Sequence, residues 1–120
     1  MAYKPSVAWE IQTSKQVTEW LLSLDEETFD LIMPAIDMLA EQGPNLGRPL
    51  ADRVKDSRHH NMKELRSVGR NIRVLFAFDP DRQAILLIGG DKAGRWTEWY
   101  RENIPLADKL YDKHLAGEKI

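Results

Sequence analysis

The sequence contains no cysteine, and this absence removes several classes of protein at once. Without cysteine there is no disulfide and no zinc site built from thiolates, and the composition suits a reducing compartment. Long apolar stretches are also missing, because even a run such as Ala84–Ile88, which no other exceeds in length, is far too short to cross a bilayer. The first twelve residues, MAYKPSVAWEIQ, lack the basic and then apolar segments of a secretion signal. We therefore expect a cytoplasmic protein that does not bind membranes.

The motifs of several common enzyme classes are absent as well. The seven glycines match neither a phosphate-binding loop nor a dinucleotide-binding fingerprint. His59, His60 and His114 do not have the spacing of zinc ligands. The nucleophile motif of serine hydrolases does not occur, and no cysteine can pair with a histidine. We expect neither a metal ion nor an organic cofactor.

We expect residues 1–120 to form one domain. Charge is distributed unevenly along it. The net charge is only −2, and 42% of the residues are hydrophobic, as in ordinary globular proteins. Residues 1–47 hold two lysines against eight acidic residues, whereas residues 48–73 hold eight lysines and arginines against three. A basic segment in an acidic protein indicates a local site for a polyanion. A solvated, arginine-rich loop is the alternative, and charge alone does not decide between the two.

Two amphipathic helices are predicted in the first third of the chain. Apolar residues recur at helical spacing over Val17–Leu24 and again over Phe29–Leu39. Asp25 is the expected N-cap of the second helix, and Gly43-Pro44 is its expected stop. Pro34 should kink that helix, because proline removes a backbone donor. Together the two helices predict an αα-hairpin.

The rest of the chain reads as short strands followed by one more helix. Asn45–Arg58 is expected to be a polar loop, and Trp96–Leu115 a final helix that bends or restarts at Pro105. Because Ile72–Phe78 is almost entirely apolar, it should be a central strand covered on both faces. The predicted fold class is α+β, with the order β-α-α-β-β-β-α. The strand-like runs are Val7–Gln12, Asn61–Val68, Ile72–Phe78 and Ala84–Gly89.

Basic residues dominate the candidate site. Arg73 is the second residue of the apolar strand and has no acidic residue beside it in the sequence, so it needs either a partner or a bound anion. Arg66 has a second interpretation, an ion pair with its same-face neighbour Glu64, which is about equally supported. Guanidinium groups suit phosphate because they grip its oxygens two at a time. The candidate cations are Lys63, Arg66, Arg70, Arg73, Lys92 and Arg95.

If the bound polyanion is RNA and is cut through its own 2′-hydroxyl, proton transfer is needed as well. A proton acceptor must serve the hydroxyl and a proton donor must serve the leaving 5′-oxygen. His60 and Tyr100 are the candidates, although sequence position does not show whether His59 or His60 faces the site. Trp96, Trp99 and Tyr100 can stack on bases, but their helical spacing favours core packing.

The segments HHNMKELR, RVLFAFDPDRQAILLIGGDKAGRW and WYRENIPLADKLYDKHL resemble the RelE/ParE superfamily of bacterial toxins. Within it they are most similar to the HigB-like, phage Gp49-like branch, and the resemblance covers most of the chain. It implies a small twisted, mainly antiparallel sheet with an αα-hairpin on one face and a C-terminal helix nearby. Arg66 and Arg73 match the arginines of the family's ELR and IR motifs, and Lys92 matches a lysine after the last strand.

The resemblance further implies a toxin of a type II toxin–antitoxin system that cuts mRNA on the ribosome without a metal ion. Arg66 and Arg73 would hold phosphates, with Lys63, Arg70, Lys92 and Arg95 adding positive charge, and His60 or Tyr100 would transfer protons. The implied partner is a HigA-like antitoxin with a helix-turn-helix domain, through which alone the pair would contact DNA. Two alternatives stay open: a ParE-like poison of DNA gyrase, and an inactive member that only binds its antitoxin.

Overall fold

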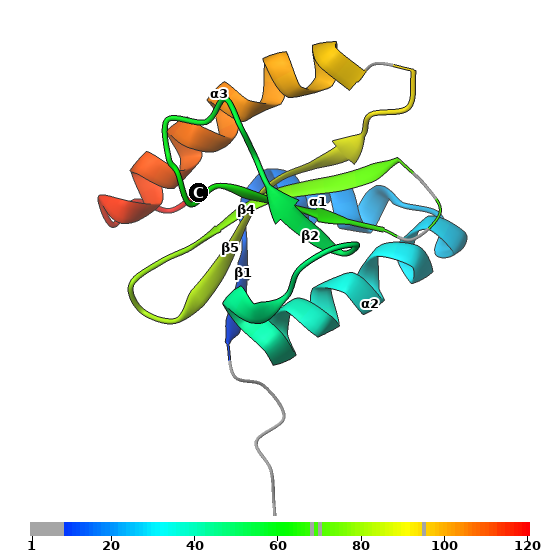
Figure 1. The fold of residues 1–120 in the computed structure, drawn as a ribbon, viewed down its shortest axis with the longest axis horizontal. Coiled ribbons are helices and arrows are strands. Elements are labelled where there is room, and N and C mark those ends of the chain that lie inside the picture. The colour runs from blue at the N-terminus through cyan, green and yellow to red at the C-terminus, as the bar shows by residue number, and fades with distance from the viewer. Residues whose placement is uncertain (1–8, 68, 70, 95) are drawn as a thin grey trace, which may run out of the picture.

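Within the residues that the structure describes, 9–67, 69, 71–94 and 96–120, a five-stranded sheet carries helices on both faces (Figure 1). The structure is a computed structural model. Across the sheet the order is β1-β5-β4-β3-β2. The β1–β5 pair is parallel, and the β5–β4, β4–β3 and β3–β2 pairs are antiparallel. The apolar strand β4 is therefore central, as predicted. The strands are β1 (Glu10–Thr13), β2 (Ala51–Arg53), β3 (Lys63–Arg66), β4 (Ile72–Phe78) and β5 (Gln83–Asp91).

Two capped helices, α1 (Lys15–Ser23) and α2 (Glu26–Gln42), cover one face of the sheet. The Ser14 hydroxyl accepts the Val17 N–H at 3.1 Å, and Asp25 accepts the Thr28 N–H at 2.9 Å, so each helix begins at a side-chain cap. α2 continues through the exposed Pro34 as one helix. The predicted αα-hairpin is confirmed, and its apolar stripes bury Ile32, Ile36 and Leu39 against Val74, Phe76 and Leu86 of the sheet.

The segment expected to be a polar loop contains an additional strand. After a short 3-10 helix, η1 (Gly43–Asn45), residues 51–53 form β2 and pair with β3 at the edge of the sheet. The prediction of a continuous loop over 45–58 is therefore wrong. The strand was missed because three residues are too few to show a periodic pattern. The pairing places Asp52 directly opposite Glu64, and this matters for the site.

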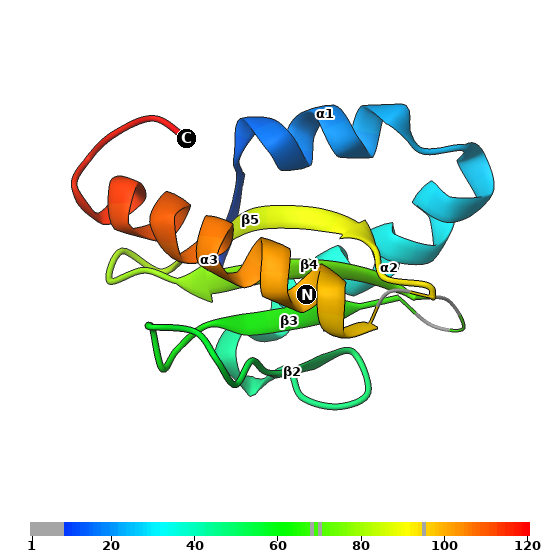
Figure 2. The same ribbon diagram turned by 90° about the horizontal axis from the view of Figure 1, so that it is seen from above.

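Helix α3 (Trp96–Leu115) covers the other face, so the sheet lies between α2 and α3 (Figures 1 and 2). It does not restart at Pro105, whose exposed position lets the helix continue. Near its N-terminus Trp99 lies so close to β5 that a Cβ on Gly90 would come within 2.8 Å of the indole Nε1. Trp99 is therefore core, as its spacing predicted, and its packing brings the next residue, Tyr100, over the sheet.

The second half of α3 is fastened to the segment between β2 and β3, residues 54–61, which we call the strap. Buried Asp108 accepts hydrogen bonds from the Ser57 hydroxyl and, at 3.0 Å, from the Arg58 N–H. His59 contacts Asp112 at 2.7 Å one helical turn further on. These contacts fix the strap as one wall of the cleft described below. None of the helices among the described residues is long and apolar enough to cross a membrane.

Candidate functional site

Four charged side chains share the α3-facing side of the sheet where β2, β3 and β4 are neighbours. Arg66 pairs with Arg73 across β3 and β4, and Asp52 pairs with Glu64 across β2 and β3. Directly paired residues project to the same face of a sheet, and so do Glu64 and Arg66, two residues apart in β3. Two arginines placed opposite one another repel, so carboxylates are needed between them.

Glu64 supplies most of that compensation and is the centre of the site. The residue is 4% exposed, and Oε1 accepts Arg66 Nε at 3.0 Å and Arg73 Nε at 3.1 Å. The Tyr100 hydroxyl donates to both carboxylate oxygens at 2.9 Å. The predicted Arg66–Glu64 pair is confirmed. Arg73 also has the partner that its position called for, and this acid comes from the adjacent strand rather than from its own.

Lys92 lies beneath this cluster, immediately after β5. It is 1% exposed, and its Nζ is 5.5 Å from the centre of the Tyr100 ring. Burial lowers the pKa of Lys92 to about 8; the charges of Arg73 and Arg66 act in the same direction, and Glu64 opposes them. The lysine that follows the last strand is thus a buried residue rather than a surface one. Lys92 contributes positive charge to the site from inside the protein.

This burial should make the stability of the protein depend on pH in a defined window. The unfolded chain keeps the Lys92 proton up to a pKa of 10.5, whereas the folded protein keeps it only up to about 8. Between those values the unfolded state binds more protons, so the free energy of unfolding should rise with pH, by about 1–2 kcal/mol between pH 7.5 and 9.5. Urea titrations of wild type and Lys92→Met measure it, and only wild type should show the rise. An equal rise in both proteins would contradict the assignment.

Tyr100 reaches the cluster from α3 and holds its proton strongly. Burial, followed by the nearby charge and hydrogen bonding of Glu64, raises the pKa of Tyr100 to about 12, although Arg73 partly opposes this. The phenol is therefore neutral at ordinary pH and donates its proton to Glu64. A neutral phenol of this kind can act as a proton donor but is a poor base.

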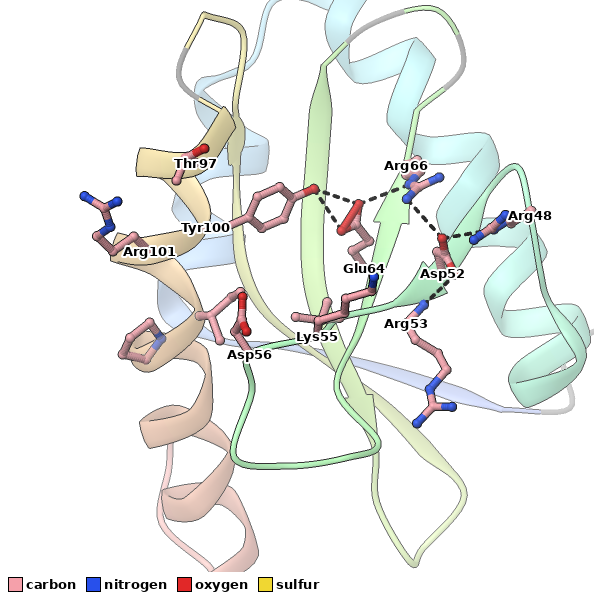
Figure 3. A pocket seen from close by; sticks show the side chains of 13 residues that line it. Arg48, Asp52, Arg53, Lys55, Asp56, Glu64, Arg66, Thr97, Tyr100 and Arg101 are labelled. Carbon is pink, nitrogen blue, oxygen red and sulfur yellow. Dashed lines mark hydrogen bonds and ion pairs between the residues drawn. The ribbon is translucent and has the colours of Figure 1, made fainter.

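A cleft of about 830 Å³ opens beside the cluster, between β2, the strap and the first half of α3. Figure 3 shows Tyr100 pointing from α3 across the cleft toward Glu64, with Arg66 approaching from β3. The acidic lining residues are Asp52, Asp56 and Glu64. The basic ones outnumber them, so the lining as a whole favours an anion. They are Arg48, Arg53, Lys55, Arg66 and Arg101.

The structure does not bring all the sequence-predicted residues together. Lys63 pairs with Phe76 and thus faces the opposite side of the sheet, where its Nζ is 5.6 Å from the Phe78 ring centre. His60 is exposed in the strap, near the Phe78 end of β4, whereas Arg73 is near the other end. These positions argue against a place for either residue in the cluster. Arg70 and Arg95 lie outside the described residues.

Sequence reasoning missed three parts of the site. Glu64 was considered only as a partner of Arg66, and Asp52 was assigned to a loop. Arg101, one residue after Tyr100, was not considered at all. Its position on α3 was predictable, but its place at the cleft depends on how α3 packs across the sheet.

The match to known proteins fits this architecture. The chain belongs to the phage-derived Gp49-like protein family, whose model matches residues 19–112. It is 55% identical over 103 residues to a Mycobacterium tuberculosis (strain ATCC 25618 / H37Rv) protein named as a HigB toxin, HigB3, covering 86% of this chain and 90% of HigB3. It is 54% identical over 114 residues to a second, HigB2, covering 92% of this chain but only 56% of HigB2. The predicted kinship with HigB-like proteins is confirmed.

A solved structure shares the fold. A chain in the crystal structure of the archaeal RelE–RelB complex from Pyrococcus horikoshii OT3 superposes with a TM-score of 0.54 at 20% sequence identity. The alignment covers 72% of this chain and 97% of that one. The RelE-like fold expected from the sequence is therefore confirmed, with β2 as an additional strand in the predicted order.

Proposed function

We propose that this protein is the toxin of a type II toxin–antitoxin pair and that it cuts mRNA in the cleft beside Glu64. The observation that carries the proposal is the convergence of two guanidinium groups and one phenol hydroxyl on a single point, with Lys92 buried beneath. Such a set of donors suits the crowded, negatively charged phosphate of a transition state. Kinship with proteins named as HigB toxins supports the toxin part of the proposal.

The proposed reaction uses the 2′-hydroxyl of the RNA as nucleophile. Its oxygen attacks the adjacent phosphorus, the bond to the 5′-oxygen breaks, and a 2′,3′-cyclic phosphate and a 5′-hydroxyl result. Arg66 and Arg73 stabilise the phosphate oxygens, and Tyr100, which keeps its proton, donates it to the leaving oxygen. Glu64 is the carboxylate of the cluster that can take the proton of the 2′-hydroxyl.

The ribosome is the proposed platform for cleavage. A cleft open to solvent binds a flexible RNA strand at many angles, whereas ribosome-held mRNA presents one phosphate in a fixed geometry, which raises the rate of reaction. We therefore expect purified protein to cut free RNA poorly.

The proposed place of action is the cytoplasm. The proposed partner is a HigA-like antitoxin with a helix-turn-helix domain, through which the pair contacts DNA, and acidic antitoxin side chains suit the basic cleft.

Induced expression in a bacterial host tests the activity. Growth should stop, and mapping of transcript ends should show cuts within translated messages in the first minutes, with chromosomal DNA intact. Intact transcripts with double-strand breaks in DNA would place the protein among gyrase poisons instead. Co-expression of the antitoxin should restore growth. Unimpaired growth with folded protein present would leave antitoxin binding as the remaining role.

A further inference from the structure

Glu64 occupies the place where the proposed phosphate ligands converge. Arg66 and Arg73 each direct Nε onto Oε1, at 3.0 and 3.1 Å, and the Tyr100 hydroxyl lies 2.9 Å from both oxygens. Two further donors of these arginines are also engaged, since Arg66 Nη2 binds Asp52 at 3.2 Å and Arg73 Nη1 binds the Ile72 carbonyl at 3.0 Å. An RNA phosphate therefore meets donors that already hold an oxyanion.

We propose that Glu64 is an internal counter-anion, which fills the phosphate site of the free protein and which a substrate phosphate displaces. This inference deepens the proposed function and rests on it. Carboxylate and phosphate oxygens take the same charge-assisted hydrogen bonds from guanidinium groups. The exchange therefore leaves the donors of Arg66, Arg73 and Tyr100 satisfied in both states.

The need for an anion at this point follows from the fold. Arg66 and Arg73 face one another across paired strands, and Arg73 is only 9% exposed. Holding two such cations together without an anion is costly, so the folded protein needs a negative charge between them. Glu64 also lines the cleft of about 830 Å³, which gives its carboxylate space to move into when another anion arrives.

A purely structural ion pair makes a different prediction. If Glu64 only stabilises the fold, its removal weakens the protein by the same amount in every buffer. If Glu64 stands in for phosphate, then phosphate added to a variant without that carboxylate should replace it and restore stability. The response of stability to phosphate therefore separates the two roles.

The variant Glu64→Gln keeps the size of the side chain and an acceptor oxygen but removes the charge. Asp56→Asn is the matched control, because exposed Asp56 lines the same cleft, so its loss changes the cleft charge equally. Melting curves are recorded in chloride and in inorganic phosphate at equal ionic strength. Glu64→Gln should melt below wild type in chloride and gain about 5 °C or more in saturating phosphate. Wild type and Asp56→Asn should gain little.

A single-stranded DNA oligonucleotide supplies the second readout, since it has phosphates but no 2′-hydroxyl and cannot be cut by the proposed reaction. Glu64→Gln should bind it about tenfold more tightly than wild type, because one charge-assisted competitor is gone. Asp56→Asn should change the affinity by no more than about twofold, because exposed charges are screened.

Two results overturn the inference: an equal phosphate response in all three proteins, or a Glu64→Gln protein that stays unfolded in phosphate. Failure here is distinguishable from failure of the proposed function. Transcript cutting without the differential phosphate response removes only the counter-anion role. A differential response without any transcript cutting removes only the nuclease.

Discussion

The Arg73→Lys variant should no longer arrest growth, although it should fold normally. Lysine keeps a positive charge beside Glu64, so the buried pair is not broken. It loses the planar fork that lets Arg73 contact both Glu64 and the Ile72 carbonyl and would let it grip a phosphate. Cleavage should fall on the order of a hundredfold or more, as when other transition-state donors are removed. Alanine at this position is a poorer test, because it leaves the Glu64 charge less compensated.

Growth arrest is measured together with a melting curve for each variant. Arg66→Lys should have a smaller effect, because the Arg66 side chain is 30% exposed and water can replace part of its contacts. Lys15→Ala, at the exposed start of α1, should remain fully toxic. If Arg73→Lys arrests growth as strongly as wild type at an unchanged melting temperature, Arg73 is a structural residue and the phosphate assignment fails.

The parts of the fold that were predictable are those that depend on local signals. Asp25 caps α2 because its carboxylate accepts the N–H of a residue only three positions away, and such a local contact can be predicted from the sequence. The central position of β4 follows from an apolar run that needs cover on both faces. β2 was not predictable, because its three residues form a strand only through pairing with β3.

The site was predictable only in part, for the same physical reason. The Arg66–Glu64 pair lies within one strand and follows from alternation, whereas the Arg73–Glu64 pair depends on the register between β3 and β4. The position of Lys63 could have been predicted from the alternation of side chains along a strand. Lys63 and Arg66 are three residues apart, and in an extended strand this spacing puts their side chains on opposite faces. The burial of Lys92 depends on α3 packing over β5, which no local pattern encodes.

The Asp108→Ala variant should lower the melting temperature by about 10 °C, from a loss of about 3 kcal/mol in the free energy of unfolding. Asp108 is 3% exposed and accepts hydrogen bonds from the Ser57 hydroxyl and the Arg58 N–H. Removing its carboxylate leaves both donors without their acceptor in a partly buried place, which is more costly than losing an exposed contact. Lys109→Ala, at the exposed neighbouring position, is the matched control and should change stability by less than about 0.5 kcal/mol.

The same substitution should reach function, because Asp108 joins the strap to the helix that carries Tyr100. The strap also carries Lys55 and Asp56, so its detachment loosens one wall of the cleft. The amide hydrogens of the strap should therefore exchange faster than in wild type, through a local opening that leaves the rest of the protein folded. Transcript cutting should fall even at temperatures where the variant is still folded. A melting temperature within about 2 °C of wild type, or unchanged exchange at Arg58, would show that the contacts of Asp108 are not needed to hold α3 over the cleft.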